Sequence, residues 1–96
     1  MKHKLLAFMM ALFCTVTLSA QVRVAGVVKD EAGNGVIGAS VVEKGTTNGA
    51  VTDLDGNYTI TVKPGATLVF SSIGYASQEI AVGNRTAINI VLKEDA

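Results

Sequence analysis

The chain has 96 residues, and this length limits it to one small domain. Its formal net charge is zero at pH 7. Six basic and eight acidic residues remain once positions 1–20 are set aside, a net charge of about −2. No run of lysine and arginine occurs in that remainder, which argues against binding to nucleic acid or to an anionic membrane surface.

The first 20 residues have the pattern of a secretory signal peptide. Met1–Lys4 is short and positive, Leu5–Leu18 is mostly apolar, and the small residues Ser19 and Ala20 precede the polar Gln21. The apolar run is too short for a membrane span, which takes about 20 residues. We therefore predict cleavage between Ala20 and Gln21, export of the mature chain, and no membrane span within it. A buried helix or a membrane anchor is the alternative.

Cysteine and histidine each occur once, and both lie in the predicted signal peptide. Cys14 follows the bulky Phe13 rather than the small residues of a lipoprotein signal, so we interpret it as part of the apolar run. The mature chain then has no disulfide and depends on its hydrophobic core. It also has no histidine to activate a serine, and no glycine-rich phosphate loop. Neither catalysis nor a cofactor is predicted.

Seven short strand signals follow, separated by turn residues at the spacing of about 8–12 residues that is typical of β-sandwiches. No stretch after residue 20 shows the 3.6-residue period of an amphipathic helix. We predict an all-β, seven-stranded antiparallel β-sandwich over residues 21–93, followed by a frayed, charged end at 94–96. The expected strands cover 21–29, 38–43, 50–52, 57–62, 67–72, 78–82 and 86–92.

Alternation of polar and apolar residues predicts which side chains face inward. It is unbroken over 57–62, where Tyr58 lies on the apolar face. Phe70 is also predicted to face inward, so we favour core packing over a ligand platform for both rings. Gly26 lies on the inward face of the first strand, which predicts the close approach of a neighbouring backbone. Tyr75 lies at a bend and is the candidate for an exposed contact.

Asn48-Gly49 and Asp55-Gly56 predict tight turns. Residues 53–57 also place oxygen ligands at alternate positions, like the start of a calcium loop. An EF-hand loop needs a glutamate at its twelfth position, where this chain has Pro64, and it needs flanking helices. We interpret 53–57 as a structural turn with no metal, and keep a weak calcium site as the alternative. Glu43 and Lys44 are interpreted as solvated residues at a strand end.

A set of glycine, threonine, aspartate and tyrosine positions recurs through the predicted strands and turns: Gly26, Gly38, Ala39, Gly45, Thr46, Gly49, Thr52, Asp53, Asp55, Gly56, Tyr58, Gly74 and Tyr75. Taken in this order, these residues resemble the carboxypeptidase-regulatory-like domain. The similar version is found at the N-terminus of SusC/RagA-type TonB-linked outer-membrane transporters of Bacteroidetes. Each motif alone is weak, but the match covers essentially all of residues 21–92.

The resemblance implies a transthyretin-like sandwich in the periplasm, associated with the outer membrane. It implies a non-catalytic accessory domain whose partners are the barrel and plug of a nutrient transporter, or its associated lipoprotein. The sequence contains no plug or barrel strands, so a fragment, a truncated form and a free-standing relative are all expected possibilities. The alternative function is a free-standing periplasmic binding or scaffold domain, which would pair a partner with an edge strand. A carbohydrate module that uses Tyr75 is a further alternative.

Overall fold

The computed structural model describes residues 20–95. The predicted signal segment lies outside the described residues up to Ser19. No helix in the described range is long and apolar enough to cross a membrane. Seven strands make up the fold: β1 (Val22–Lys29), β2 (Ser40–Glu43), β3 (Gly49–Val51), β4 (Asn57–Val62), β5 (Thr67–Ser71), β6 (Gln78–Ala81) and β7 (Ile90–Val91).

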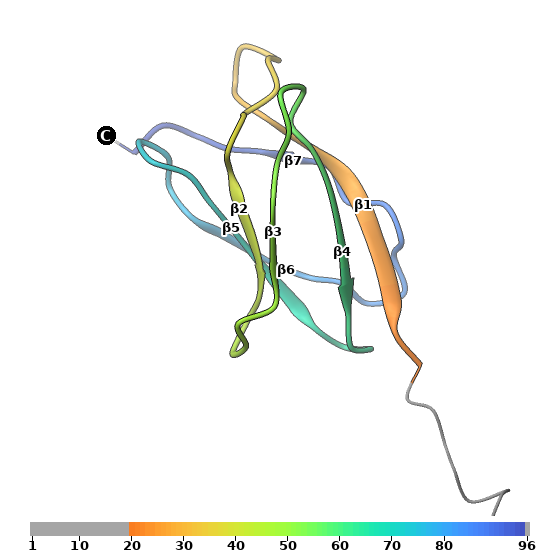
Figure 1. Cartoon of the computed structure of the whole chain (residues 1–96). Helices are drawn as coiled ribbons and strands as arrows, with labels where there is room; N and C mark the ends of the chain where they lie inside the picture. Colours follow the sequence, from red (N-terminus) through yellow and green to blue (C-terminus); the bar gives the residue numbers. More distant parts are fainter. Residues whose placement is uncertain (1–19, 96) are drawn as a thin grey trace, which may run out of the picture.

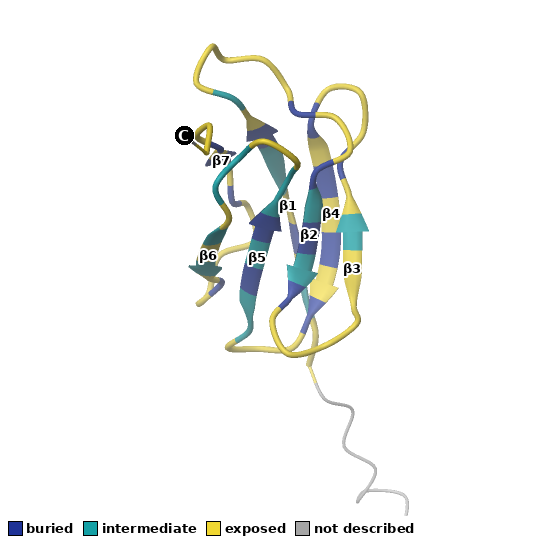
Figure 2. Cartoon of the chain, turned by 90° about the vertical axis from the view of Figure 1, so that its left-hand side faces the viewer, coloured by how far each residue is buried: buried dark blue, intermediate teal, exposed yellow. Residues whose placement is uncertain are grey.

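The strands form two sheets, with the orders β4-β1-β7 and β3-β2-β5-β6. The two sheets face each other, and the buried residues lie between them (Figures 1 and 2). The prediction of an all-β sandwich with seven strands is confirmed. The longest pairing joins β1 to β4, from Val22 opposite Val62 to Val27 opposite Asn57.

One pairing corrects the expectation of a purely antiparallel sandwich. β7 runs parallel to β1, with Val28 opposite Ile90 and Lys29 opposite Val91. The reason is the connection, because a parallel neighbour needs a crossover. β6 belongs to the other sheet, and the segment 82–89 carries the chain across to the first sheet at the end where β1 begins. The chain therefore runs alongside β1 in the same direction, and β7 pairs with the last two residues of β1.

Two strands, β2 and β7, are shorter than the sequence predicts by two residues or more, for local reasons. β2 begins at Ser40, because Gly38 adopts a φ of 72°, which no strand residue has. β7 contains only two residues, because the ladder before it is interrupted. The backbone N–H of Val27 donates to the side-chain oxygen of Asn89 at 3.0 Å instead of to a backbone carbonyl.

The core follows the predicted alternation. The burial of β4 alternates from exposed to buried along its six residues, and Tyr58, Ile60 and Val62 face inward. Leu68 and Phe70 of β5 are fully buried on the opposing sheet. The rings of Tyr58 and Phe70 meet edge to face, with centroids 5.4 Å apart and an interplanar angle of 76°. This aromatic pair joins the two sheets at the centre of the sandwich.

The sandwich has two ends, which we call poles. The C-terminal pole comprises the loops 30–39, 52–56 and 72–77 together with residues 92–95. The N-terminal pole comprises the loops 44–48, 63–66 and 82–89 together with residues 20 and 21. The register places them so, because Ser40 lies opposite both Val51 and Ser71. The first and last described residues therefore lie at opposite ends of the molecule (Figure 1).

Candidate functional site

Tyr58 and Gly26, both predicted from the family pattern, form one structural unit. They lie opposite each other in the β1–β4 pairing. The Tyr58 hydroxyl reaches past Gly26 and donates a hydrogen bond to the backbone carbonyl of Ile88 at 2.7 Å. A Cβ atom at Gly26 would collide with that carbonyl and press on the Tyr58 ring. Glycine is required here because three segments meet without room for a side chain.

The environment of the Tyr58 hydroxyl favours its neutral form. The side chain is buried, and burial raises its pKa from 10.0 to about 12, although the positive charge of Arg85 acts in the opposite direction. The hydroxyl is therefore protonated at neutral pH and donates its hydrogen bond to the carbonyl of Ile88. Its role is to tie β4 to the crossover segment, across β1.

Thr52 is a buried polar residue that connects two loops of the C-terminal pole. Its hydroxyl donates to the carbonyl of Val36 at 2.5 Å and accepts from the N–H of Ala39 at 2.8 Å. Its backbone N–H donates to the carbonyl of Ala39 at 3.0 Å, and its carbonyl accepts from Gly38 at 3.2 Å. A threonine satisfies four polar groups here without water, which explains why Gly38, Ala39 and Thr52 occur together in the pattern.

Two turns at the C-terminal pole have the same sequence pattern, Asp-x-x-Gly-Asn. They span residues 30–34 and 53–57. In each, one carboxylate oxygen of the aspartate accepts the backbone N–H groups two and four residues later, at 2.9 to 3.0 Å. In each, the glycine has a positive φ, 88° at Gly33 and 82° at Gly56. Asp53 thus acts as a turn-forming aspartate whose carboxylate is engaged with its own backbone.

The two turns pack directly against each other through glycines. A Cβ atom at Gly35 would collide with the carbonyl of Asp55, and one at Gly56 would collide with the carbonyl of Val28. The backbone N–H of Val28 donates to the carbonyl of Gly56 at 2.8 Å. The repeated Asp-x-x-Gly-Asn pattern is the signal from which this pair of turns could have been predicted.

Glu43, at the N-terminal pole, corrects an interpretation from the sequence. It was expected to be solvated, but only 7% of it is exposed. Its two carboxylate oxygens accept from the side-chain amide of Asn48 at 3.1 Å and from the backbone N–H of Lys63 at 3.3 Å. The carboxylate is buried because these donors replace water. Lys44, its neighbour, instead pairs with Glu79 at 2.6 Å on the exposed surface.

The loop 44–48, which contains Gly45 and Thr46 and leads into Gly49 of β3, closes one side of the sandwich. The Thr46 hydroxyl donates to the carbonyl of Glu43 at 2.9 Å and accepts from the N–H of Asn48 at 3.0 Å. The Asn48 amide then donates to the carbonyl of Thr61 in β4 at 2.7 Å. On the other side, Gln78 of β6 donates to the carbonyl of Val91 at 2.6 Å. One side-chain amide therefore links the two sheets at each side.

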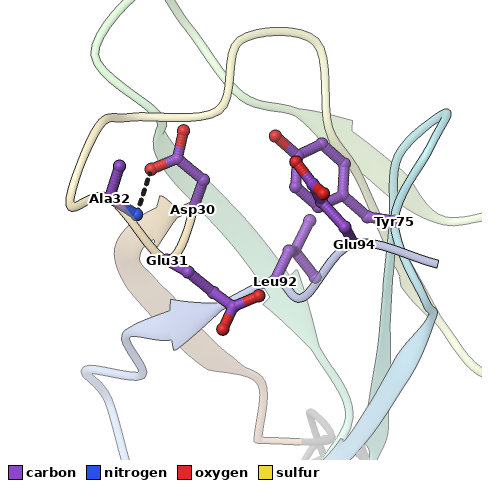
Figure 3. Close-up of a pocket in the computed structure, with 6 residues that line it drawn as sticks. All are labelled: Asp30, Glu31, Ala32, Tyr75, Leu92 and Glu94. Atoms are coloured by element: carbon purple, nitrogen blue, oxygen red, sulfur yellow. Dashed lines mark hydrogen bonds between the residues drawn. The ribbon is translucent and has the colours of Figure 1, made fainter. Parts of the chain in front are cut away.

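Tyr75 lies beside a cavity of about 370 Å³ at the C-terminal pole. It is half-buried, so the expectation of a freely exposed ring is only partly met. An isolated bridge pairs Tyr75 with Glu94, and the carbonyl of Gly74 accepts from Asp95 at 3.0 Å. Figure 3 shows Tyr75 and Glu94 on one side, Asp30 and Glu31 on the other, and Leu92 between them. Ala32 completes the lining.

The structure thus distributes the predicted motif residues over several places. Most of them hold the backbone of turns and loops, and Tyr75 is the motif residue that lines the cavity at the C-terminal pole. The carboxylates of that cavity were not predicted as a group, because they come from segments more than sixty residues apart in the sequence. Within residues 20–95, no group of three or more histidine, cysteine, aspartate and glutamate residues is placed to hold a metal ion.

The arrangement defines a small β-sandwich domain in which the residues of the family pattern mostly maintain the fold, and the cavity beside Tyr75 lies at one pole. Residues 24–96 match the CarboxypepD_reg-like domain model, so the chain belongs to the CarboxypepD_reg-like domain family. The resemblance seen in the sequence is confirmed.

Relatives within this family are parts of much larger proteins. The chain is 45% identical to the TonB-dependent receptor SusC of Bacteroides thetaiotaomicron, over 95% of this chain and 9% of that receptor. It is 44% identical to a TonB-dependent receptor of Formosa agariphila, over 94% of this chain and 9% of the receptor. The chain therefore spans about a tenth of the length of the curated relatives it matches.

Solved structures support the fold alone. Chains from two mutant type II cohesin–X-dockerin complexes of Acetivibrio cellulolyticus superpose with TM-scores of 0.58 and 0.59. They are 23% and 21% identical over 73% and 76% of this chain, and the match covers 52% and 58% of those chains. At that identity the likeness shows a shared sandwich and carries no function.

Proposed function

We propose that this chain is the N-terminal accessory domain of a SusC-type, TonB-dependent outer-membrane importer. The observation that carries the proposal is the identity of 45% over nearly the whole chain to a short part of a TonB-dependent receptor. The domain would be exported and would lie in the periplasm, next to the plug and barrel of the receptor or its associated lipoprotein.

The chemistry of the domain fits a binding role rather than catalysis. The residues of the family pattern are engaged with the backbone. Thr52 and Tyr58 both donate to carbonyls in the interior, and Asp53 accepts from its own turn. The hydroxyls of Thr52 and Tyr58 are therefore engaged rather than poised to act as a base or a nucleophile, and one oxygen of Asp53 is held by its own turn. The loops at the two poles and the edge strands of the sheets are the surfaces that a partner could use.

A tag inserted into the native gene tests the proposal. The loop at Thr47 is exposed and lies between two strands, so a short epitope there leaves the sheets intact. Envelope fractions are then separated, and the tagged product is detected by immunoblot. We expect a product roughly ten times longer than this chain, given the 9% coverage of the relatives, in the outer-membrane fraction.

Protease treatment of the same cells tests the side of the membrane. We expect the tag to survive in intact cells and to be lost once the outer membrane is permeabilised. A tagged product in the soluble periplasmic fraction that is no heavier than this chain, 9.9 kDa before cleavage, plus the tag would instead support a free-standing binding domain. A tag cleaved in intact cells would place the domain outside and would contradict the proposal.

A further inference from the structure

Charge is distributed unequally between the two poles. Of the charged residues at or next to the C-terminal pole, six are acidic and two are basic: Asp30, Glu31, Asp53, Asp55, Glu94 and Asp95 against Lys29 and Lys93. At or next to the N-terminal pole lie four basic residues, Arg23, Lys44, Lys63 and Arg85, and one acidic residue, the buried Glu43. A surface with this excess of one sign attracts partners of the opposite sign and speeds their association.

Large apolar side chains are exposed among these acidic residues. Ile73 is 100% exposed, Leu54 is 80% exposed and Ile37 is 59% exposed. They lie in three different loops of the C-terminal pole. Leaving several large aliphatic side chains in water at one end has no benefit for the fold, and such groups mark interaction surfaces. The charge and the apolar residues therefore point to the same end of the molecule.

The cavity beside Tyr75 adds a specific shape to this end. Its walls combine an aromatic ring, the aliphatic Leu92 and the carboxylates of Asp30, Glu31 and Glu94 (Figure 3). One oxygen of Asp30 is already engaged with its own turn. An arginine or lysine side chain suits such a site, because its stem packs on apolar groups and its charge meets both the ring face and the carboxylates. A volume of about 370 Å³ accommodates one such side chain.

We propose that the C-terminal pole binds a basic segment of a partner protein, and that the Tyr75 cavity receives one of its arginine or lysine side chains. A second copy of this chain fits less well, because half of the cations at the N-terminal pole are already engaged. Lys44 pairs with Glu79, and Arg85 donates to the carbonyls of Val82 and Ala81. The inference rests on the proposed function in one respect. If the chain is part of a longer receptor, the receptor would continue from the last described residues, which lie at this pole.

A peptide titration tests the inference. The sample is this 96-residue chain, expressed with its signal segment and purified after export. The probe is acetyl-Ile-Arg-Ile-amide, and its matched control replaces arginine with the uncharged isostere citrulline. Backbone amide signals are followed by nuclear magnetic resonance at low salt. We expect shifts at Ala32, Tyr75 and Glu94, and at least tenfold weaker binding of the citrulline peptide. Glu31→Gln combined with Glu94→Gln should weaken the arginine peptide by a similar factor.

Glu79→Gln is the matched control variant, because it removes an exposed carboxylate that lies outside the C-terminal pole. It should leave peptide binding unchanged. Equal binding of the two peptides, equal effects of Glu79→Gln and the double variant, or the absence of shifts at millimolar peptide would each overturn the inference. Shifts of the same amides that depend on protein concentration without peptide would assign the pole to a second copy and overturn it as well. None of these outcomes alters the size of the tagged product, so the proposed function is tested separately.

Discussion

Replacing Tyr58 by phenylalanine removes one hydroxyl and leaves the ring in the core. The hydroxyl donates to the carbonyl of Ile88 at 2.7 Å in a buried site. Its loss leaves that carbonyl without this donor, which costs about 1–3 kcal/mol of unfolding free energy. Tyr58→Ala removes the ring as well, including its contact with Phe70, and should cost about 3–5 kcal/mol, enough to unfold a small domain.

The raised pKa of Tyr58 adds a pH dependence to the same prediction. The pKa is about 12 in the folded protein and 10.0 in the unfolded chain. The native state therefore holds the proton more tightly, and its contribution is complete below pH 10 and is lost as the pH rises from 10 through 12. Over that window the loss amounts to about 1–3 kcal/mol, at 1.36 kcal/mol for each unit.

Urea unfolding followed by far-UV circular dichroism measures both effects. We expect Tyr58→Phe to be less stable than the wild type at pH 7, and the gap between the two to narrow from pH 10 to pH 12. Tyr75→Phe is the control, since it should retain the full alkaline loss. A constant gap across this pH range would refute the assignment of the alkaline loss to Tyr58.

Three further substitutions test other parts of the fold. Gly26→Ala should unfold the domain or cost more than about 3 kcal/mol, because its Cβ would collide with the Ile88 carbonyl; equal melting temperatures for the variant and the wild type would contradict this. Thr52→Val leaves the Val36 carbonyl and the Ala39 N–H without their partner and should cost about 2–4 kcal/mol in urea unfolding. Asp55→Asn should change stability by less than about 0.5 kcal/mol, because its side chain lies in an exposed turn. Calcium-dependent melting that Asp55→Asn abolishes would instead establish the calcium site.

The fold was predictable because its signals are local. The unbroken alternation of 57–62 predicted the inward face of β4, and the structure buries Tyr58 on that face. The position of Gly26 predicted a close backbone approach, which the Ile88 carbonyl provides. Alternation and turn residues act over a few positions, so a single sequence contains them.

The features that were missed depend on residues far apart in the sequence. Glu43 appeared to be a solvated strand end, but it is buried because Asn48 and Lys63 supply donors to it. The parallel pairing of β1 and β7 depends on which sheet receives β6, and no local pattern encodes that choice. The cavity at Tyr75 joins residues 30–32 to residues 92 and 94. Such arrangements exist only after the chain has folded.

The residues that identify the family and the residues proposed to bind a partner are almost entirely separate. Gly26, Thr52 and Tyr58 bond or make room for backbone inside the sandwich, so a relative that keeps them keeps the fold. Glu31 and Glu94 beside Tyr75 are exposed loop residues that can change at little cost in stability, whereas Asp30 also holds its own turn. Identity to a receptor therefore indicates a shared scaffold, while the choice of partner depends on the loops of the C-terminal pole. Receptors that share this domain but differ in the loops of the C-terminal pole should accordingly bind different partners.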